Sequence, residues 1–115
     1  MRGTGSVKAK AELAGSAAVF AALGDETRLG LVSRLSDQGP LSIAKLTSGF
    51  EITRQGITKH LRVMANAGLV RAMQQGRESI WQLDRKRLAD ARRYLQTIST
   101  QWDDALGRLK TFVEE

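Results

Sequence analysis

Long polar side chains gather on one side of the segment from Thr53 to Val70, and their chemistry suits nucleic acid. On the opposite side, Ile57, Leu61 and Met64 recur at the i, i+4 and i+7 spacing of one helical face, which predicts a buried apolar stripe. Guanidinium, ammonium, amide and hydroxyl groups bind phosphates and the edges of bases in a major groove. The candidate DNA-binding residues, all away from the stripe, are Arg54, Gln55, Thr58, Lys59 and Arg62.

The ends of this segment carry the signals of a short helix. Thr53 is suited to the N-cap, because its hydroxyl accepts a hydrogen bond from a first-turn N–H. Gly68 is suited to the position after the last turn, where a left-handed conformation is favoured. We therefore predict a recognition helix over residues 53–67, followed by an extended segment that starts at Leu69 and Val70.

Positive charge is concentrated around this helix. Between Glu51 and Glu78 there is no acidic residue, whereas acids and bases are mixed elsewhere in the chain. A generic solvated helix could carry the same side chains, so the neighbouring elements must separate the two interpretations. The cations in this interval are Arg54, Lys59, Arg62, Arg71 and Arg77.

Composition narrows the classes of function. The 115 residues fit one small domain, and the net charge of +6 favours an anionic partner, first of all nucleic acid. Aromatic residues make up only 5% of the chain, which disfavours a base-stacking platform and favours double-stranded DNA over single strands. No apolar run is long enough for a transmembrane helix, so we expect a cytoplasmic protein with no membrane partner.

The same composition argues against an enzyme and against a metal site. The chain has no cysteine and a single histidine, His60, which has no second His or Cys to join it as a ligand. A packing or phosphate-contacting role for His60 is therefore favoured. Asp103 and Asp104 are adjacent on a helix and diverge by about 100°, so they do not converge on a substrate. We predict no catalytic residues, no metal and no cofactor.

The elements before the recognition helix complete a helix-turn-helix. Residues 1–6 are expected to form a flexible N-terminal arm, and residues 7–115 one domain that opens with an Ala-rich helix over 7–23. Asp25 is suited to cap a second helix that ends at Gly39, with Leu29, Val32 and Leu35 facing inward. Ser42 is suited to cap a short third helix, and a brief link then leads to Thr53.

A β-hairpin follows the recognition helix. Two extended runs, 69–73 and 79–83, flank a turn in which Gly76 meets the need for positive φ. A hairpin in this position is a candidate wing over residues 69–83, with Arg77 at its tip able to reach a minor groove or a phosphate. A hairpin this short would equally serve to cap the core, so the wing interpretation depends on its position in the chain.

Asp84 is suited to cap a long last helix over residues 85–113. At 1.5 Å per residue its length is roughly 42 Å, more than the width of so small a domain, and its apolar residues follow a heptad pattern. A seam that overhangs its own domain predicts a homodimer, unless the seam lies mainly on the core of the same chain. The predicted dimer interface includes Leu95, Ile98, Trp102 and Leu109.

At this point the chain resembles the ArsR/SmtB family of winged-helix transcriptional repressors. The resemblance covers about residues 21–83 and rests most specifically on LGDETRL and TKHLRVMANAGLV. It implies a mostly α fold, with four helices, a two-stranded β wing and a fifth helix. It also implies a dimer built from the first and last helices, and Thr58 and Lys59 in the major groove.

Two departures from the family pattern stand out. Glu26 occupies a position where many members have Pro, which affects only the helix start. Metal-sensing members carry Cys or His ligands, often in the third helix, and LSIAKLTSGF contains neither. The chain therefore resembles the cysteine-free members that sense something other than a metal or repress constitutively.

The leading hypothesis is a homodimeric, sequence-specific transcriptional repressor that binds a palindromic operator through helix 53–67 and the wing 69–83. Dimerisation helices would lie at 7–23 and 85–113. The alternative is a protein-interaction module with little or no DNA binding, against which the acid-free interval argues. The sequence does not indicate an inducer ligand, an operator or the regulated genes.

Overall fold

The computed structural model describes the backbone of residues 2–114 and the side chains of residues 10–114. The chain forms five helices and a small sheet in the order predicted for a winged helix-turn-helix, with one added strand. The elements are α1 (Arg2–Leu23), α2 (Glu26–Gln38), β1 (Leu41–Ser42), α3 (Ile43–Thr47), α4 (Arg54–Asn66), β2 (Val70–Gln75), β3 (Glu78–Leu83) and α5 (Arg85–Glu114).

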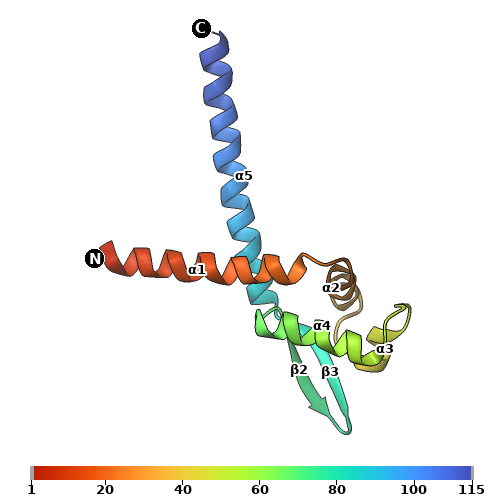
Figure 1. Cartoon of the computed structure of the whole chain (residues 1–115). Helices are drawn as coiled ribbons and strands as arrows, with labels where there is room; N and C mark the ends of the chain where they lie inside the picture. The colour runs from red at the N-terminus through yellow and green to blue at the C-terminus, as the bar shows by residue number, and fades with distance from the viewer. Residues whose placement is uncertain (1, 115) are drawn as a thin grey trace.

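The molecule consists of a compact body and two projecting helices. Helices α2, α3 and α4 and the sheet form the body, from which the hairpin of β2 and β3 extends (Figure 1). Helix α1 crosses the first part of α5, and both helices continue well beyond the body (Figure 1). The described chain measures 66 × 38 × 20 Å along its principal axes, an elongated shape that comes from these two arms.

The predicted apolar stripe of α4 lies at the centre of the core. Ile57, Leu61 and Met64 are fully buried, and α4 packs against α1, α2, α3 and β2. Fully burying side chains of this size stabilises the fold by about 1.5–3 kcal/mol each. The remaining buried core residues come from the other helices, β1 and the start of the hairpin: Val19, Ala22, Leu31, Leu35, Leu41, Leu46, Leu69, Val70 and Ala91.

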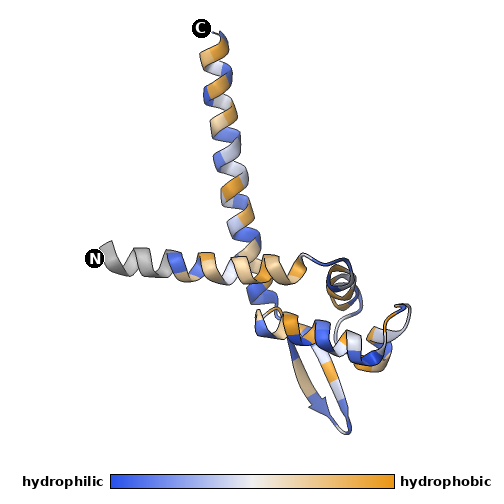
Figure 2. Cartoon of the chain, viewed as in Figure 1, coloured by the Kyte–Doolittle hydropathy of each residue, from blue (hydrophilic) through white to orange (hydrophobic). Residues whose placement is uncertain are grey.

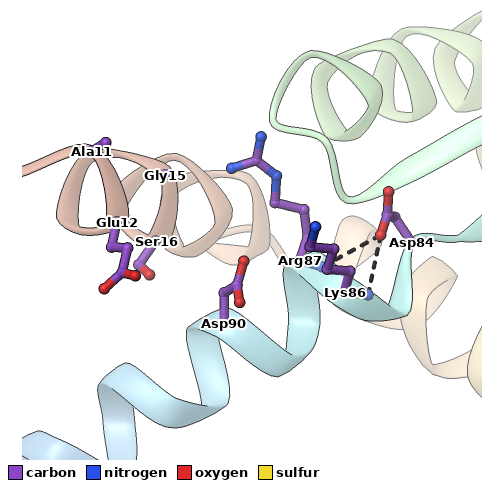
Figure 3. A pocket seen from close by; sticks show the side chains of 8 residues that line it. All are labelled: Ala11, Glu12, Gly15, Ser16, Asp84, Lys86, Arg87 and Asp90. Carbon is purple, nitrogen blue, oxygen red and sulfur yellow. Dashed lines mark hydrogen bonds between the residues drawn. The ribbon is translucent and has the colours of Figure 1, made fainter. Parts of the chain in front are cut away.

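The predicted helix caps are all present. The Thr53 hydroxyl accepts a hydrogen bond from the Gly56 N–H, and the Ser42 hydroxyl accepts one from the Lys45 N–H. The Asp25 carboxylate accepts from the Arg28 N–H. Asp84 accepts from two N–H groups in the first turn of α5 (Figure 3). Gly68, just after α4, has φ 76°, as its predicted role requires.

A tight contact closes the N-terminal turn of α4. Ile52, one residue before the Thr53 cap, is partly buried on the core beside the helix. Such a residue packs on the fourth helical residue, here Ile57, as a hydrophobic staple. Gly56 makes room for this packing, because a Cβ added there would lie only 2.5 Å from Cγ2 of Ile52.

The sheet has three strands, whereas the sequence predicted two. Its order is β1-β3-β2, all antiparallel. The unpredicted strand β1 is two residues long and pairs Leu41 with Trp81 and Ser42 with Ile80. The predicted hairpin is confirmed, but its strands extend closer to the tip than the predicted runs 69–73 and 79–83, with Gln75 paired to Glu78 across a two-residue turn. Gly76, the first turn residue, has φ 63°, which glycine adopts without steric cost.

The buried face of α2 and the start of α1 also differ from the predictions. Leu29, predicted to face inward, is 50% exposed, and Leu31 is fully buried instead. The buried face of α2 is set by Leu31 and Leu35, four residues apart, and Leu29 lies off it. Helix α1 begins at Arg2 rather than near Val7. Side chains 2–9 lie outside the described set, so the flexible arm over residues 1–6 stays a prediction.

His60 joins α4 to α2. Its Nδ1 atom lies 3.1 Å from Nη1 of Arg28 and 3.8 Å from a carboxylate oxygen of Asp25. The Arg28 guanidinium also donates to the Ala22 carbonyl at the end of α1. His60 therefore has a packing role between helices, one of the two roles that the sequence favoured.

The pKa of Asp25 lies below its ordinary value, mainly because the carboxylate accepts the hydrogen bond from the Arg28 N–H. The charges of Arg28 and His60 lower this pKa further, and partial desolvation opposes them.

None of the described helices is long and apolar enough to cross a membrane.

We predict that Gly56→Ala destabilises the protein, although alanine favours helices by about 1 kcal/mol over glycine. The clash with Ile52 is expected to outweigh that gain and lower the free energy of unfolding by about 1–3 kcal/mol. The control is Gly107→Ala in α5, where nothing lies within 4 Å of the added Cβ. It should raise stability by about 0.5–1 kcal/mol. Urea unfolding at one protein concentration measures both, and a stabilising Gly56→Ala would contradict the packing described.

We predict that Asp25→Asn destabilises the protein in a pH-dependent way. Asparagine keeps an oxygen for the cap but loses the charge. Because the folded-state pKa of Asp25 is lowered, its stabilising effect is present above the unfolded pKa near 3.8 and is lost as pH falls through the folded value. Urea unfolding of both proteins between pH 7 and pH 3 should show a difference that shrinks on acidification. A difference independent of pH would contradict the assignment.

Candidate nucleic-acid interface

The predicted contact residues of α4 lie on its solvent face. Arg54, Gln55, Lys59 and Arg62 are exposed, and Thr58 is half-buried. Figure 2 shows hydrophilic and hydrophobic residues alternating along α4, as expected when one face is buried and the other is solvated. The helix has 13 residues and is therefore about 20 Å long. A single helix of this size fits the major groove of B-DNA, which is about 12 Å wide.

The Thr58 hydroxyl is already engaged as a donor. Its Oγ1 donates to the Arg54 carbonyl one turn earlier, at 2.9 Å. A hydroxyl has one hydrogen and two lone pairs, so the remaining polar capacity of Thr58 is to accept. In a major groove the matching donors are the amino groups of adenine and cytosine, and the Thr58 methyl group suits a thymine methyl.

Two further residues share this face and were missed in the sequence. Val63 is 43% exposed, and Asn66 in the last turn of α4 is also exposed. Their positions follow Gln55 and Lys59 at helical spacing, so the signal was present in the sequence. Asparagine is suited to adenine and an exposed valine to a thymine methyl, which extends the candidate face to the end of α4.

The hairpin carries Arg77 at its exposed tip, as predicted, and Arg71 on β2 is exposed as well. The side chain of Gln74 forms two hydrogen bonds that hold the tip together. Its amide donates to the Gly76 carbonyl at 3.2 Å, and its carbonyl oxygen accepts from the Ser79 hydroxyl at 3.3 Å. These two hydrogen bonds were not predicted, because they depend on the register of the two strands.

None of the Arg and Lys side chains of α4 and the hairpin takes part in an ion pair among the described side chains. The ion pairs found there are Asp90 with Arg93, and the contact between His60 and Asp25. Guanidinium and ammonium groups without an internal partner are available to neutralise phosphates. The surface of α4 and the hairpin is therefore suited electrostatically to a polyanion.

The predicted dimer seam is exposed along most of α5. Leu88 packs on the core and Ala91 is buried, but the seam leaves the body after that point. From there the four predicted interface residues are between 44% and 63% exposed: Leu95, Ile98, Trp102 and Leu109. Leu106, Phe112 and Val113 add to this apolar strip and are exposed too.

Comparison with known proteins agrees with this geometry. Residues 23–71, from the end of α1 to the start of β2, match a family described as a helix-turn-helix domain. An HTH-type transcriptional regulator of Mycobacterium tuberculosis is 33% identical over 95 residues, which cover 72% of this chain and 88% of the relative. The arsenical resistance operon repressor of Escherichia coli is 36% identical over 59 residues, covering 51% of this chain and 50% of the repressor.

Solved structures give the same result over a longer stretch. An ArsR-like transcriptional regulator from Rhodococcus sp. RHA1 superposes with a TM-score of 0.75 at 34% identity. The match covers 87% of this chain and 93% of that one. The superposed part is longer than residues 23–71, so it includes segments outside the helix-turn-helix match. The chain belongs to the ArsR family of winged helix-turn-helix proteins, which are DNA-binding transcriptional regulators and not enzymes.

Proposed function

We propose that the protein is a homodimeric repressor that binds a palindromic operator, with one α4 helix from each protomer in the major groove. The observation that carries this proposal is the arrangement of α4. Its apolar stripe is fully buried, and its opposite face presents Arg and Lys side chains that make no ion pair with any described residue. The proposal places the protein in the cytoplasm, in contact with the chromosome.

The roles of the side chains follow from their chemistry. Arg54, Lys59 and Arg62 on α4, together with Arg77 at the wing tip, would supply the phosphate contacts that position the protein. Gln55 and Thr58 would read base edges, Gln55 with an amide able to pair with adenine and Thr58 as an acceptor. Phosphate contacts add affinity for any duplex, whereas base contacts separate the operator from other sequences.

The exposed seam of α5 supports a dimer. A contiguous apolar strip of this kind is rarely left in water by a monomer, and a second copy would cover it symmetrically. A winged helix-turn-helix domain from Mycobacterium bovis with the same fold is described as homodimeric; it is 21% identical with a TM-score of 0.63. We infer that α1 and α5 pair with their counterparts and that Leu95, Ile98, Trp102 and Leu109 are buried there.

Selection of bound fragments from random double-stranded DNA, followed by sequencing, tests the whole proposal. It should recover a palindrome with half-sites about 10–10.5 base pairs apart, or a multiple of that spacing, because the two α4 helices are related by a two-fold axis. Repression is then tested with a reporter placed behind the recovered site. Enrichment of no sequence, or of a site without symmetry, would contradict the proposal.

We predict different effects for two substitutions on α4. Lys59→Ala should weaken binding to the selected operator and to random DNA alike, and reduce the salt dependence by about one contact. Gln55→Ala should mainly lower the ratio of the two affinities, by about 1–3 kcal/mol, or roughly 5- to 150-fold. Fluorescence anisotropy titrations at several salt concentrations measure both quantities. Two variants that bind the operator as tightly as the wild type would refute these roles.

We also predict that Ile98→Lys disrupts the dimer. It places a charge in the middle of the seam, where burial without a partner costs several kcal/mol. The matched control is Thr100→Lys, also an exposed position of the same helix but off the seam. Sedimentation velocity should show Ile98→Lys largely as single chains and Thr100→Lys as dimers. Equal behaviour of the two variants would mean that the seam is not the interface.

A further inference from the structure

Helix α3 is too short to be stable without contacts from the rest of the fold. It spans five residues, little more than one turn, so its last carbonyl groups have no partners within the helix. The connection to α4 follows directly; it ends at the N-cap Thr53, immediately before the first contact residues, Arg54 and Gln55. The groups that hydrogen-bond to the last carbonyls of α3 therefore also influence the position at which the chain enters α4.

Arg34 of α2 supplies partners for two of these carbonyl groups, while backbone N–H groups of Ser48 and Phe50 supply them for Ala44 and Thr47. Its Nη1 donates to the Lys45 carbonyl at 3.2 Å and to the Leu46 carbonyl at 3.1 Å, and it also contacts the Ser48 carbonyl. A guanidinium near the C-terminal end of a helix is favourable for the helix dipole as well. These contacts span 11 to 14 residues of sequence, so one side chain ties the middle of α2 to the end of α3.

The Arg34 guanidinium also packs on Phe50, in the turn that follows α3. Its carbon lies 4.8 Å from the centre of the Phe50 ring, within the range of a cation–π contact. The Phe50 ring lies against α2, since a Cβ added to Gly30 would be 3.2 Å from it. Gly49 has φ 89°, and a Cβ there would lie 3.0 Å from Nη2 of Arg34. We refer to Arg34, Phe50, Gly30 and Gly49 as the α2 clamp.

We infer that Arg34 is a positioning residue for sequence recognition, which holds the turn between α3 and α4 so that Arg54 and Gln55 meet the DNA in register. The inference rests on the proposed function of α4. Phe50 precedes the N-cap Thr53 by three residues, so loosening the clamp shifts the first turn of α4. Leu61 and Met64 remain fully buried farther along, which keeps the rest of the helix in place.

This role differs from a phosphate contact. Nη1 of Arg34 is engaged by three carbonyl groups, and the guanidinium is stacked on Phe50. Lysine at this position keeps the charge but has neither the planar group nor the reach of arginine. Glutamine removes the charge. The two substitutions therefore separate the geometry of the side chain from its charge.

The test compares Arg34→Lys, Arg34→Gln and Phe50→Leu with wild type, and uses Arg93→Lys on the exposed face of α5 as the matched control. For the three clamp variants, the ratio of affinities for the selected palindrome and random DNA should fall at least about tenfold. Affinity for random DNA should change by less than about twofold, with an unchanged salt slope. Arg93→Lys should match wild type. A salt slope lower by about one in Arg34→Gln, with the ratio unchanged, would show a phosphate contact and overturn the inference.

Amide hydrogen exchange of the free proteins gives a second measurement that does not depend on DNA. Exchange in residues 48–55 should be faster in each clamp variant than in wild type, while the amides of Leu61 and Met64 should stay protected. Unchanged exchange in residues 48–55 would overturn the inference even for a variant that folds well. A wild type that shows no preference for any selected sequence would instead refute the proposed function, and the exchange result would still decide the role of Arg34.

Discussion

Burial of the apolar stripe of α4 decides which face of this helix, and so which of its candidate DNA contacts, meets solvent. Ile57, Leu61 and Met64 are fully buried and are surrounded by α1, α2, α3 and β2. With 3.6 residues per turn, a helix held on one face has no freedom to rotate its other face away from solvent. The cationic and amide side chains of α4 therefore project outward because their neighbours are packed inward.

Helix α5 gives the second constraint, since it belongs to the core at one end and leaves it at the other. Ala91 is buried with the core, whereas Trp102 is 63% exposed about three turns later. The Asp84 cap and the crossing with α1 fix the direction in which α5 departs (Figures 1 and 3). In the proposed dimer, that direction sets the distance between the two α4 helices and therefore the spacing of the half-sites.

Features that depend on neighbouring residues were predictable from the sequence. The Thr53 cap, the stripe of α4 and the positive φ of Gly68 and Gly76 are confirmed, because each is set by residues no more than about two helical turns apart. Strand β1 was not predicted, because two residues are too few to show an alternating pattern. Leu29 was misplaced because it and Leu31 both fit an apolar pattern, and tertiary packing chose between them.

The same distinction between local and tertiary features applies to the candidate site. The exposed residues of α4 and Arg77 were predicted from residue type and helical spacing, although Val63 and Asn66 were overlooked. Contacts across the fold were not predictable. Arg34 meets carbonyl groups more than ten residues away, Gln74 meets Ser79 through strand pairing, and Arg28 meets His60 across two helices. Such contacts depend on a tertiary arrangement that local sequence patterns do not describe.

The most direct measurement of the central claim is an amide NMR titration of the protein with the selected duplex. Our account predicts that the largest shift changes fall on residues 53–63 of α4 and on Gly76 and Arg77 at the wing tip. The amides of the exposed half of α5 should change little, since in the proposed dimer that face is covered by the second protomer. Changes centred on α5, with α4 unaffected, would contradict the claim that the outer face of α4 reads DNA.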